Sequence, residues 1–319
     1  MKIAIIILSV LTFFATVVLI TAYVCFRLVC YSEKRPPLGE DEYDLPEGDV
    51  YIPFHQRMID WVKIKRSLPC EELEITSFDG LRLRGKYYKF FDDAIVEILI
   101  HGYRGNSERD LSAGLERCKR LGRNAVLVDL RGAGNSDGNV ISFGINEHKD
   151  LLRWIDFMIE KLGKDVKIIL TGISMGGSTV VMTAGKKLPE NVVCVLSDCG
   201  FSSAKAILYK VLTDMKLPPK LFYPFIRLGA ILYGGFDLND EPAIEAVKKA
   251  TVPIIFIHGE SDDFVPCYMS RELFDECSAP KNLVIIKGAG HGLAYPTDKD
   301  TYVNALKDFA NECGFQKFE

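Results

Sequence analysis

The chain has 319 residues, of which 48% are hydrophobic, and a formal net charge of -4 at pH 7. This length predicts one large domain with additions, or two small domains. We expect no nucleic-acid partner, because a chain with more acidic than basic residues has no general positive field to attract phosphates.

Residues 3–26 form an uncharged, apolar stretch near the start of the chain. As a helix, this stretch would extend about 36 Å at about 1.5 Å per residue, which is enough to cross a bilayer. A cleaved signal peptide would need a shorter apolar region and a small-x-small cleavage site. Residues 22–24 match such a site poorly, and residues 28–30 match a lipoprotein cleavage box poorly. We therefore expect residues 1–30 to be an uncleaved transmembrane anchor.

The orientation of this anchor is nearly balanced. Lys2 lies before the apolar stretch, whereas Arg27, Lys34 and Arg35 follow it, and positive residues favour the cytoplasmic side. Nine cysteines, an odd number without regular spacing, are typical of reduced thiols. Both observations favour a cytoplasmic main domain slightly. A short N-terminal anchor that begins with Lys2 often leaves the body of a protein outside, which is the opposing argument.

Residues 31–69 are predicted to join the anchor to the main domain. Residues 31–53 carry three prolines and an acidic cluster, and we interpret them as a solvated spacer. Residues 55–67 place Met58 and Val62 on one face at helical spacing. This pattern predicts a short helix that lies on the domain or on the membrane surface.

The main domain, residues 70–319, shows two strands followed by alternating strands and helices. The first two strands, 71–78 and 81–89, flank a Phe-Asp-Gly turn and predict a hairpin. Antiparallel strands followed by β-α units predict a mostly parallel, eight-stranded sheet with helices on both faces. The remaining strands are predicted at 94–100, 125–130, 166–171, 192–197, 253–258 and 283–286, and the helices at 107–121, 146–162, 178–187, 269–277 and 298–312.

Residues 201–250 interrupt this alternation between the sixth and seventh strands. The segment is too long for a bare loop and is rich in Phe, Tyr and Leu. We interpret it as a small helical lid over the site. An extra packing layer without a gating role is the alternative.

The most informative motif is Gly172-Ile173-Ser174-Met175-Gly176, which directly follows the fifth predicted strand. A strand that ends in Gly-x-Ser-x-Gly and opens into a helix is typical of a nucleophile elbow. The turn is so tight that the neighbours of the serine must lack bulk. The motif therefore predicts Ser174 as a nucleophile whose hydroxyl projects above the edge of the sheet.

A serine nucleophile needs a base, and the base needs an acid that holds its tautomer. His291 lies in a glycine-rich loop after the last predicted strand and is the expected base. The acid is expected between Ser174 and His291 in the chain. We predict Asp262, with Asp263 as the near alternative and Asp198 as a weaker one.

Two backbone N–H groups are needed to hold the negative charge that develops on the attacked carbonyl oxygen. Met175, directly after the nucleophile, is expected to supply one. Tyr103, in the loop after the third strand, is expected to supply the other. His101 and His258 each lie at a strand end before a glycine, where a structural hydrogen-bonding role is favoured over catalysis.

These motifs and their order resemble the α/β-hydrolase superfamily over about residues 70–319. The resemblance is strongest to bacterial serine hydrolases of the serine aminopeptidase-like or esterase-like type, several of which carry an N-terminal anchor. It implies the α/β-hydrolase fold and the triad Ser174, Asp262 and His291. It does not imply a substrate, because this scaffold hosts many reactions. The matching segments are residues 101–106, 129–136, 172–176, 258–266 and 290–291.

We expect no cofactor and no metal. Gly132 and Gly134 follow a strand as in a dinucleotide-binding motif, but Asp137 stands where the third glycine should be. No His-x-x-x-His or paired Cys-x-x-Cys motif indicates a metal site. Cys194 and Cys199 are interpreted as buried fillers.

The sequence thus predicts a membrane-anchored serine hydrolase that cleaves a carboxylic ester with an apolar acyl part. The expected partners are a small-molecule acyl substrate and the membrane. An aminopeptidase or other amidase is the alternative activity. A non-catalytic binding protein on a hydrolase fold is the alternative class.

Overall fold

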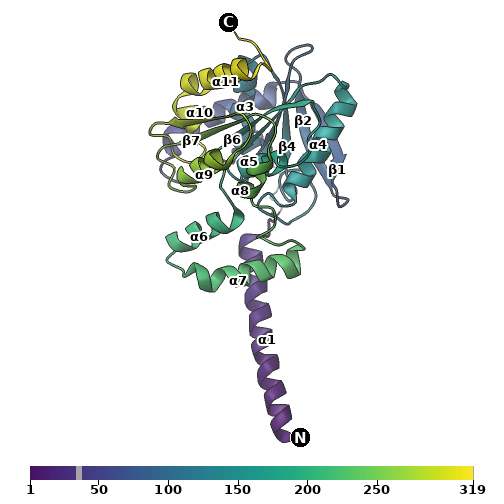
Figure 1. Ribbon diagram of the computed structural model, residues 1–319, viewed down its shortest axis with the longest axis vertical. Coiled ribbons are helices and arrows are strands. Elements are labelled where there is room, and N and C mark those ends of the chain that lie inside the picture. The colour runs from purple at the N-terminus through teal and green to yellow at the C-terminus, as the bar shows by residue number, and fades with distance from the viewer. Residues whose placement is uncertain (34–37, 319) are drawn as a thin grey trace.

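The computed structural model describes residues 1–33 and 38–318. Its core is one eight-stranded sheet with the order β1-β2-β4-β3-β5-β6-β7-β8, covered by helices on both faces (Figure 1). Strand β2 runs antiparallel to β1 and β4, and the other neighbouring strands are parallel. This is the predicted mostly parallel sheet. Lys34 and Arg35, which entered the prediction of orientation, lie outside the described residues.

All eight predicted strands are present, and each end lies within two residues of its predicted position. Strands β3, β4 and β7 are buried along their whole length, because helices cover both of their faces. Strand β1 buries only alternate residues, as an antiparallel edge strand does. The strands are β1 (Glu71–Thr76), β2 (Arg82–Tyr88), β3 (Val96–Ile100), β4 (Asn124–Asp129), β5 (Ile168–Ile173), β6 (Val192–Asp198), β7 (Ile254–Gly259) and β8 (Lys281–Ile286).

The five helices predicted between the strands are also present. The helix predicted at 178–187 begins three residues earlier, at Met175, directly after Ser174. The helices are α1 (Lys2–Val29), α2 (His55–Ser67), α3 (Ser107–Arg120), α4 (Glu147–Leu162), α5 (Met175–Ala184), α6 (Ala204–Asp214), α7 (Pro219–Gly229), α8 (Ala243–Ala246), α9 (Tyr268–Glu276), α10 (Ala294–Thr297) and α11 (Lys299–Cys313), with short turns η1 (Ile52–Phe54), η2 (Ala230–Gly234) and η3 (Val247–Lys249).

The sheet separates two apolar cores. Successive residues Ile169 and Leu170 of β5 enter opposite cores, since neighbouring side chains of a strand point to opposite faces. Trp154 of α4 lies in the core that contains Leu170, and Phe309 of α11 lies in the other. The parallel strands are therefore held from both sides, which fixes the loops at their carboxyl ends.

Helix α1 projects from the domain as a stalk (Figure 1). Residues 3–20 are exposed, whereas Ala22, Phe26 and Cys30 are buried against the domain. Within the described part of the chain, α1 is the one helix long and apolar enough to cross a membrane. The predicted anchor coincides with this helix, and its insertion into a membrane stays a prediction.

Residues 38–67 lie on the domain. Arg66 of α2 donates hydrogen bonds to the backbone carbonyls of Glu40 and Glu42 and to the carboxylate of Glu108 in α3. Helix α2 has the predicted bounds and packs against α3. Most of the described residues before α2 are exposed, so the interpretation as a solvated spacer stays a prediction, although Arg66 ties the segment to the domain.

The insertion between β6 and β7 is helical, as predicted, and it packs against α1 (Figure 1). At the crossing of α7 and α1, a side chain on Gly229 would meet the backbone oxygen of Ala22 and lie 2.9 Å from Cβ of Phe26. The hydroxyl of Tyr233 in η2 donates to the carbonyl of Leu19 over 3.2 Å. The glycine thus permits a close approach of the two helices.

Candidate active site

Ser174 occupies the sharp turn between β5 and α5. Its backbone has φ 56° and ψ -119°, a strained conformation for a residue with a side chain. A side chain on Gly172 would collide with the backbone of Gly176, and one on Gly176 with the carbonyl of Ile100. The backbone N–H of Ser174 donates to the carbonyl of Asp198 in the neighbouring strand over 2.8 Å. The glycines of the motif are therefore required by close backbone contacts.

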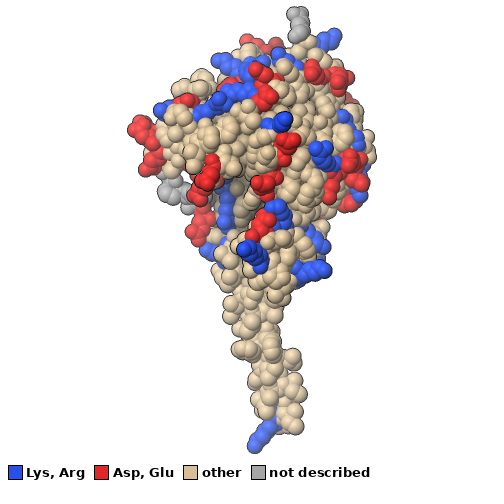
Figure 2. All heavy atoms as spheres, turned by 90° about the vertical axis from the view of Figure 1, so that its left-hand side faces the viewer, with Lys and Arg blue, Asp and Glu red and all other residues tan. Residues whose placement is uncertain are grey.

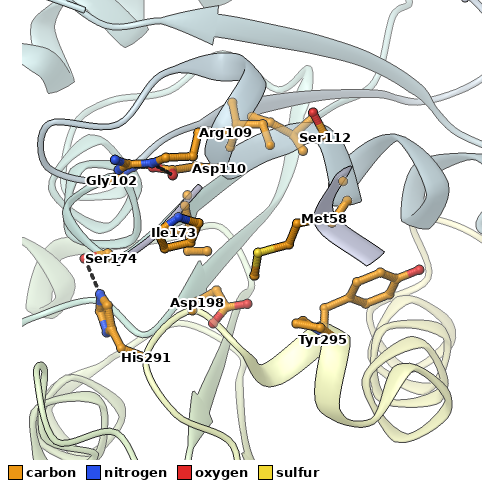
Figure 3. A pocket seen from close by; sticks show the side chains of 18 of the residues that line it. Met58, Gly102, Arg109, Asp110, Ser112, Ile173, Ser174, Asp198, His291 and Tyr295 are labelled. Atoms are coloured by element: carbon orange, nitrogen blue, oxygen red, sulfur yellow. Dashed lines mark hydrogen bonds and ion pairs between the residues drawn. The ribbon is translucent and has the colours of Figure 1, made fainter. Parts of the chain in front are cut away.

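The structure brings Ser174, His291 and Asp262 into one hydrogen-bonded chain, of which Figure 3 shows the contact between Ser174 and His291. His291 Nε2 lies 2.9 Å from Ser174 Oγ, and His291 Nδ1 lies 2.7 Å from Asp262 Oδ2. Because the carboxylate can only accept, Nδ1 carries the proton and Nε2 is free to accept one from the serine. The three residues come from the loops after β5, β7 and β8, at the edge where ligands bind in such sheets.

Asp262 is buried and firmly oriented. Its Oδ1 accepts from the backbone N–H groups of Phe264 and Val265 over 3.0 and 2.8 Å. Burial alone would raise the pKa of Asp262, but hydrogen bonds from His258 and His291 lower it to about 2. The carboxylate is therefore ionised at neutral pH. The side chain of the near alternative acid, the adjacent Asp263, is exposed.

His258 positions the loop that carries Asp262. Its Nε2 lies 2.8 Å from the carbonyl of Val265 and 3.2 Å from Asp262 Oδ2, and its Nδ1 lies 2.6 Å from Ser270 Oγ. A carbonyl only accepts, so Nε2 carries the proton. These contacts agree with the structural role predicted for this histidine.

His101 also has the predicted structural contacts. Its Nε2 accepts the backbone N–H of Leu130 over 3.0 Å, so the proton is on Nδ1, which donates to the carbonyl of Gly102 over 2.8 Å. Both ring nitrogens are thereby used, and the ring joins the ends of β3 and β4.

The predicted oxyanion donors are the backbone N–H groups of Tyr103, in the loop after β3, and of Met175, directly after Ser174. The loop of Tyr103 is close to the nucleophile, since a Cβ on Gly102 would lie 3.3 Å from Ser174 Cβ. Among the described residues, no hydrogen bond uses the backbone N–H of Tyr103 or Met175. The hydroxyl of Tyr103 donates to the carbonyl of Val29 over 2.8 Å, which fixes this loop to the end of α1. Their role as oxyanion donors stays a prediction.

A cavity of about 220 Å³ has Ser174 and His291 in its wall (Figure 3). Much of the rest of the wall is apolar and includes Leu99, Ile173 and Tyr295. Sites for drug-sized ligands typically measure roughly 300–1,000 Å³. The cavity therefore suits a small, largely apolar group next to the nucleophile.

The cavity is covered by the segment before the sheet. Pro46, Tyr51, Met58 and Trp61 line it, whereas none of residues 201–250 does. The insertion packs on α1, as the alternative of an extra packing layer predicts, and the segment that includes α2 lines the cavity instead. The helical spacing of Met58 and Val62 indicated one face of a helix, but nothing in the sequence showed that this face lines the cavity of Ser174.

Two buried residues, Asp198 and Cys199, lie beside the hydrogen bonds that join Ser174, His291 and Asp262. The sequence did not predict the contacts that these two residues make. Asp198, the weaker candidate for the acid, does not bond His291; its Oδ2 accepts the hydroxyl of Tyr302 over 2.9 Å. Cys199 has its sulfur within 4.8 Å of ring and carboxylate atoms of His291 and Asp262. Burial raises the pKa of Cys199 well above its usual range, which favours a neutral thiol and agrees with a filler.

Two family models match overlapping parts of the chain. The model described as "alpha/beta hydrolase fold" matches residues 98–230. The model described as "Serine hydrolase (FSH1)" matches residues 190–303. Together they cover the segments from β3 to the region after His291.

Individual relatives and solved structures agree with these matches. The uncharacterized protein YqkD of Bacillus subtilis is 25% identical over 245 residues, covering 75% of this chain and 80% of YqkD. The mitochondrial palmitoyl-protein thioesterase ABHD10 of Rattus norvegicus is 24% identical over 261 residues, covering 75% of this chain and 80% of that protein. The Pyrococcus furiosus esterase Pf2001 has a similar fold, with a TM-score of 0.66, 17% identity, and coverage of 89% of this chain and 98% of the esterase.

The strand order, the strained serine after β5 and the two matches between residues 98 and 303 point to one family. The chain belongs to the α/β-hydrolase superfamily and is related to its serine hydrolases.

Proposed function

We propose that this protein is a membrane-anchored serine hydrolase that cleaves a carboxylic ester through an acyl-enzyme on Ser174. The observation that carries the proposal is the hydrogen-bonded chain from Asp262 through His291 to Ser174, which ends in a small, largely apolar cavity. A serine held in this way is activated as a nucleophile.

In the first half of the reaction, Ser174 Oγ attacks the ester carbonyl carbon and His291 Nε2 takes the hydroxyl proton. The carbonyl oxygen becomes an oxyanion, which the N–H groups of Tyr103 and Met175 stabilise. When the carbonyl re-forms, the carbon–oxygen bond to the alcohol breaks, and His291 gives its proton to the leaving alcohol. Asp262 stays ionised and holds the imidazole in the required tautomer throughout.

In the second half, water replaces the alcohol. His291 takes a proton from the water as its oxygen attacks the acyl carbon, and returns the proton to Ser174 Oγ as the acyl–serine bond breaks. The products are a carboxylic acid and free enzyme. Each half passes through a tetrahedral oxyanion that the same two N–H groups hold, so removal of one donor is expected to lower kcat by roughly 10²–10³.

An ester substrate is supported by the names of two proteins that this chain resembles. One is called an esterase and the other a palmitoyl-protein thioesterase. In both, the name describes transfer of an acyl group from an oxygen or sulfur leaving group. A peptidase is the second candidate, because the carboxyl of Asp198 lies in the cavity wall and could receive a free amino group. A panel of matched ester and amide substrates separates the two activities.

The chemistry is tested with a fluorophosphonate probe on the full-length chain in detergent micelles. We expect the wild type to be labelled and the Ser174→Ala variant to be unlabelled. The matched control is Ser67→Ala, which removes an exposed hydroxyl at the end of α2 and should leave labelling unchanged. Equal labelling of wild type and Ser174→Ala would refute the proposed nucleophile.

The membrane anchor is supported by the surface of α1. Figure 2 shows that the stalk is free of acidic and basic side chains between the domain and its tip, where Lys2 lies. At about 1.5 Å per residue, residues 3–22 span about 30 Å, the thickness of a bilayer's hydrocarbon core. Leaving this much apolar surface in water would be unfavourable. The level of Ala22 then marks the membrane surface.

The insertion reaches the same level beside α1. The rings of Tyr23 and Tyr233 pack with their centroids 5.2 Å apart, and aromatic side chains are enriched at membrane surfaces. Leu221, Ile231 and Leu232 of α7 and η2 are largely exposed. We propose that α7 and η2 rest on the bilayer surface as a second contact, which holds the domain close to the membrane.

This contact is tested by tryptophan fluorescence in vesicles that contain brominated lipids. A Leu232→Trp variant should be quenched by the bromines. A Phe78→Trp variant, at an exposed position in the hairpin between β1 and β2, should not be. The two native tryptophans, Trp61 and Trp154, are buried and provide a constant background. Equal quenching of both variants would contradict the contact, and release of the full-length protein by detergent-free fractionation would contradict the anchor.

We also propose that the main domain lies on the cytoplasmic side of the membrane. Cys70 is exposed and precedes β1, so it reports the side on which the domain lies. With a membrane-impermeant maleimide, we expect no labelling of Cys70 in intact cells and labelling after lysis. Labelling in intact cells would place the domain outside.

A further inference from the structure

The cavity beside Ser174 contains two buried polar atoms without partners. Asp198 Oδ1 and Arg117 Nε are completely buried and make no hydrogen bond within the described residues. Both side chains line the cavity that holds Ser174. Buried polar atoms are nearly always hydrogen-bonded, so an orphan in a cavity wall indicates a place for a polar group of a ligand or for a water.

Asp198 is held in position by two hydrogen bonds. Its backbone carbonyl accepts the N–H of Ser174 over 2.8 Å. Its Oδ2 accepts the hydroxyl of Tyr302 over 2.9 Å, and the same hydroxyl lies 3.4 Å from Arg117 Nη1. Figure 3 shows the carboxyl of Asp198 pointing into the cavity, towards the space between Met58 and Tyr295. The carboxyl group therefore lies in the wall of the cavity, next to whatever occupies it.

The distance from the nucleophile is set by the sheet. In the register of β5 and β6, Asp198 pairs with Ile173, the residue directly before Ser174. Neighbouring strands lie about 4.8 Å apart. We therefore expect a substrate group that bonds Asp198 to lie close to the carbonyl that Ser174 attacks.

A positive charge already lies close to Asp198, because Arg117 contacts the hydroxyl of Tyr302 that bonds Asp198 Oδ2. An added ammonium would be repelled by this buried guanidinium. Burial raises the pKa of Asp198, against the hydrogen bond from Tyr302. A neutral hydrogen-bond donor fits better than a cationic one.

We propose that Asp198 is a specificity-determining residue that accepts a hydrogen bond from a hydroxyl group on the chain of the substrate next to the scissile ester. The substrates are then esters of hydroxylated acyl chains or of short polyols, and a plain hydrocarbon chain leaves the Asp198 oxygen unsatisfied. This inference rests on the proposed function, because it names the substrate class of the same site. A buried acceptor opposite a substrate without a donor stays unsatisfied, which is expected to separate otherwise identical esters by tenfold or more.

The test compares matched methyl esters with the full-length protein in detergent micelles. The series is methyl hexanoate, the same ester with a hydroxyl at carbon 3 or carbon 6, and the 6-amino ester. We expect kcat/KM for the better hydroxy ester to exceed that for methyl hexanoate at least tenfold. We expect the amino ester to gain less than the hydroxy ester. A larger gain in kcat/KM for the amino ester would show that an amine, not a hydroxyl, is the recognised group. Equal rates for all esters would mean that the unpaired atoms of Asp198 and Arg117 bind water only.

Variants assign the preference to Asp198. In Asp198→Ala the ratio of hydroxy ester to plain ester should fall to about one. If the alanine variant does not fold, Asp198→Asn takes its place, because asparagine keeps the shape of the side chain and the bond to Tyr302. In this variant the ratio of hydroxy ester to plain ester should fall at least threefold. The control Asp156→Asn removes an exposed carboxylate on α4 and should keep the wild-type ratio. An unchanged ratio in both Asp198 variants would overturn the assignment.

Failure of this inference is distinguishable from failure of the proposed function. If the wild type reacts with the fluorophosphonate and hydrolyses the series without preference, the specificity role of Asp198 is wrong and Ser174 chemistry stands. If the wild type neither reacts with the probe nor hydrolyses any ester, the proposed function itself is wrong.

Discussion

Residues 38–67 and residues 201–250 are both helical additions near the same edge of the sheet, but they pack on different partners. The first segment lines the Ser174 cavity through Met58 and Trp61. The second lies against α1 and contributes nothing to that cavity within the described residues. Closure of the site and attachment to the stalk are thus carried by separate segments.

The end of α1 connects these two regions. Tyr103, beside the nucleophile, donates to Val29, and Arg104 donates to Leu28 and Tyr31. The loop that is expected to hold the oxyanion is therefore fixed by the same helix that α7 crosses. Changes in the insertion should alter the stability and the membrane contact, whereas changes in the first segment should alter substrate preference.

The largest effect is expected where α7 crosses α1. A Gly229→Ala variant places a Cβ against the backbone of Ala22 and 2.9 Å from Cβ of Phe26, so the helices must separate. We expect the free energy of unfolding to fall by about 1–3 kcal/mol, measured by thermal unfolding in micelles. The control in the first segment is Gly39→Ala, whose Cβ would make an ordinary contact 3.6 Å from Glu42 and should be tolerated. Equal losses in both variants would show that the close crossing has no special role.

A second, smaller effect is expected in substrate preference. Met58→Ala enlarges the cavity, which should raise kcat/KM for a longer acyl ester relative to a shorter one by about tenfold, since one methylene in a fitted pocket is worth roughly 1–3 kcal/mol. Rates for methyl butanoate and methyl octanoate measure this ratio. The matched change in the insertion, Leu221→Ala, lies on an exposed surface and should leave the ratio unchanged. A shift with Leu221→Ala instead would restore the insertion as the cover of the site.

The smallest effect is expected from the contacts through which Arg66 holds the first segment. We call these contacts the Arg66 clasp. Arg66→Gln removes the ion pair with Glu108 and the hydrogen bonds to the carbonyls of Glu40 and Glu42. These contacts are partly exposed, so the loss should be about 0.5–1 kcal/mol. Hydrogen exchange of residues 38–45 should accelerate in the variant, and unchanged exchange would contradict the clasp.

The same clasp should loosen in acid. Burial alone would raise the pKa of Glu108, but hydrogen bonds and charges from Arg66 and Lys65 lower it. Because folding lowers this pKa, the contribution to stability is present above the unfolded value of about 4.3 and is lost as the pH falls further. After correction for intrinsic rates, exchange of residues 38–45 should be faster at pH 3.5 than at pH 7 in the wild type, and less so in Arg66→Gln.

The sequence predicted the sheet well, because its signals are local. Short apolar runs bounded by turns predicted every strand, and the glycines around Ser174 predicted a turn whose backbone contacts forbid larger residues. Asp262 and His291 followed from the order of the motifs, and the structure places them in contact with each other. Their catalytic roles stay a prediction.

The packing of the two added segments could not be predicted in the same way. The first segment is held through the backbone carbonyls of Glu40 and Glu42, which carry no signal in the side-chain pattern. The aromatic and apolar residues of the insertion suit a lid and a contact with α1 equally. Asp198 and Arg117 come from different elements, and no motif indicates that they share a cavity.

The central claim is that an acyl group is transferred to Ser174. The most direct measurement is mass spectrometry of the full-length protein quenched in acid during turnover of an activated ester. We predict a mass increase equal to the acyl group on the peptide that contains Ser174, and none in Ser174→Ala. An acyl adduct on another residue would contradict the account. Turnover of the ester by both wild type and His291→Ala, without any adduct at Ser174, would also contradict it.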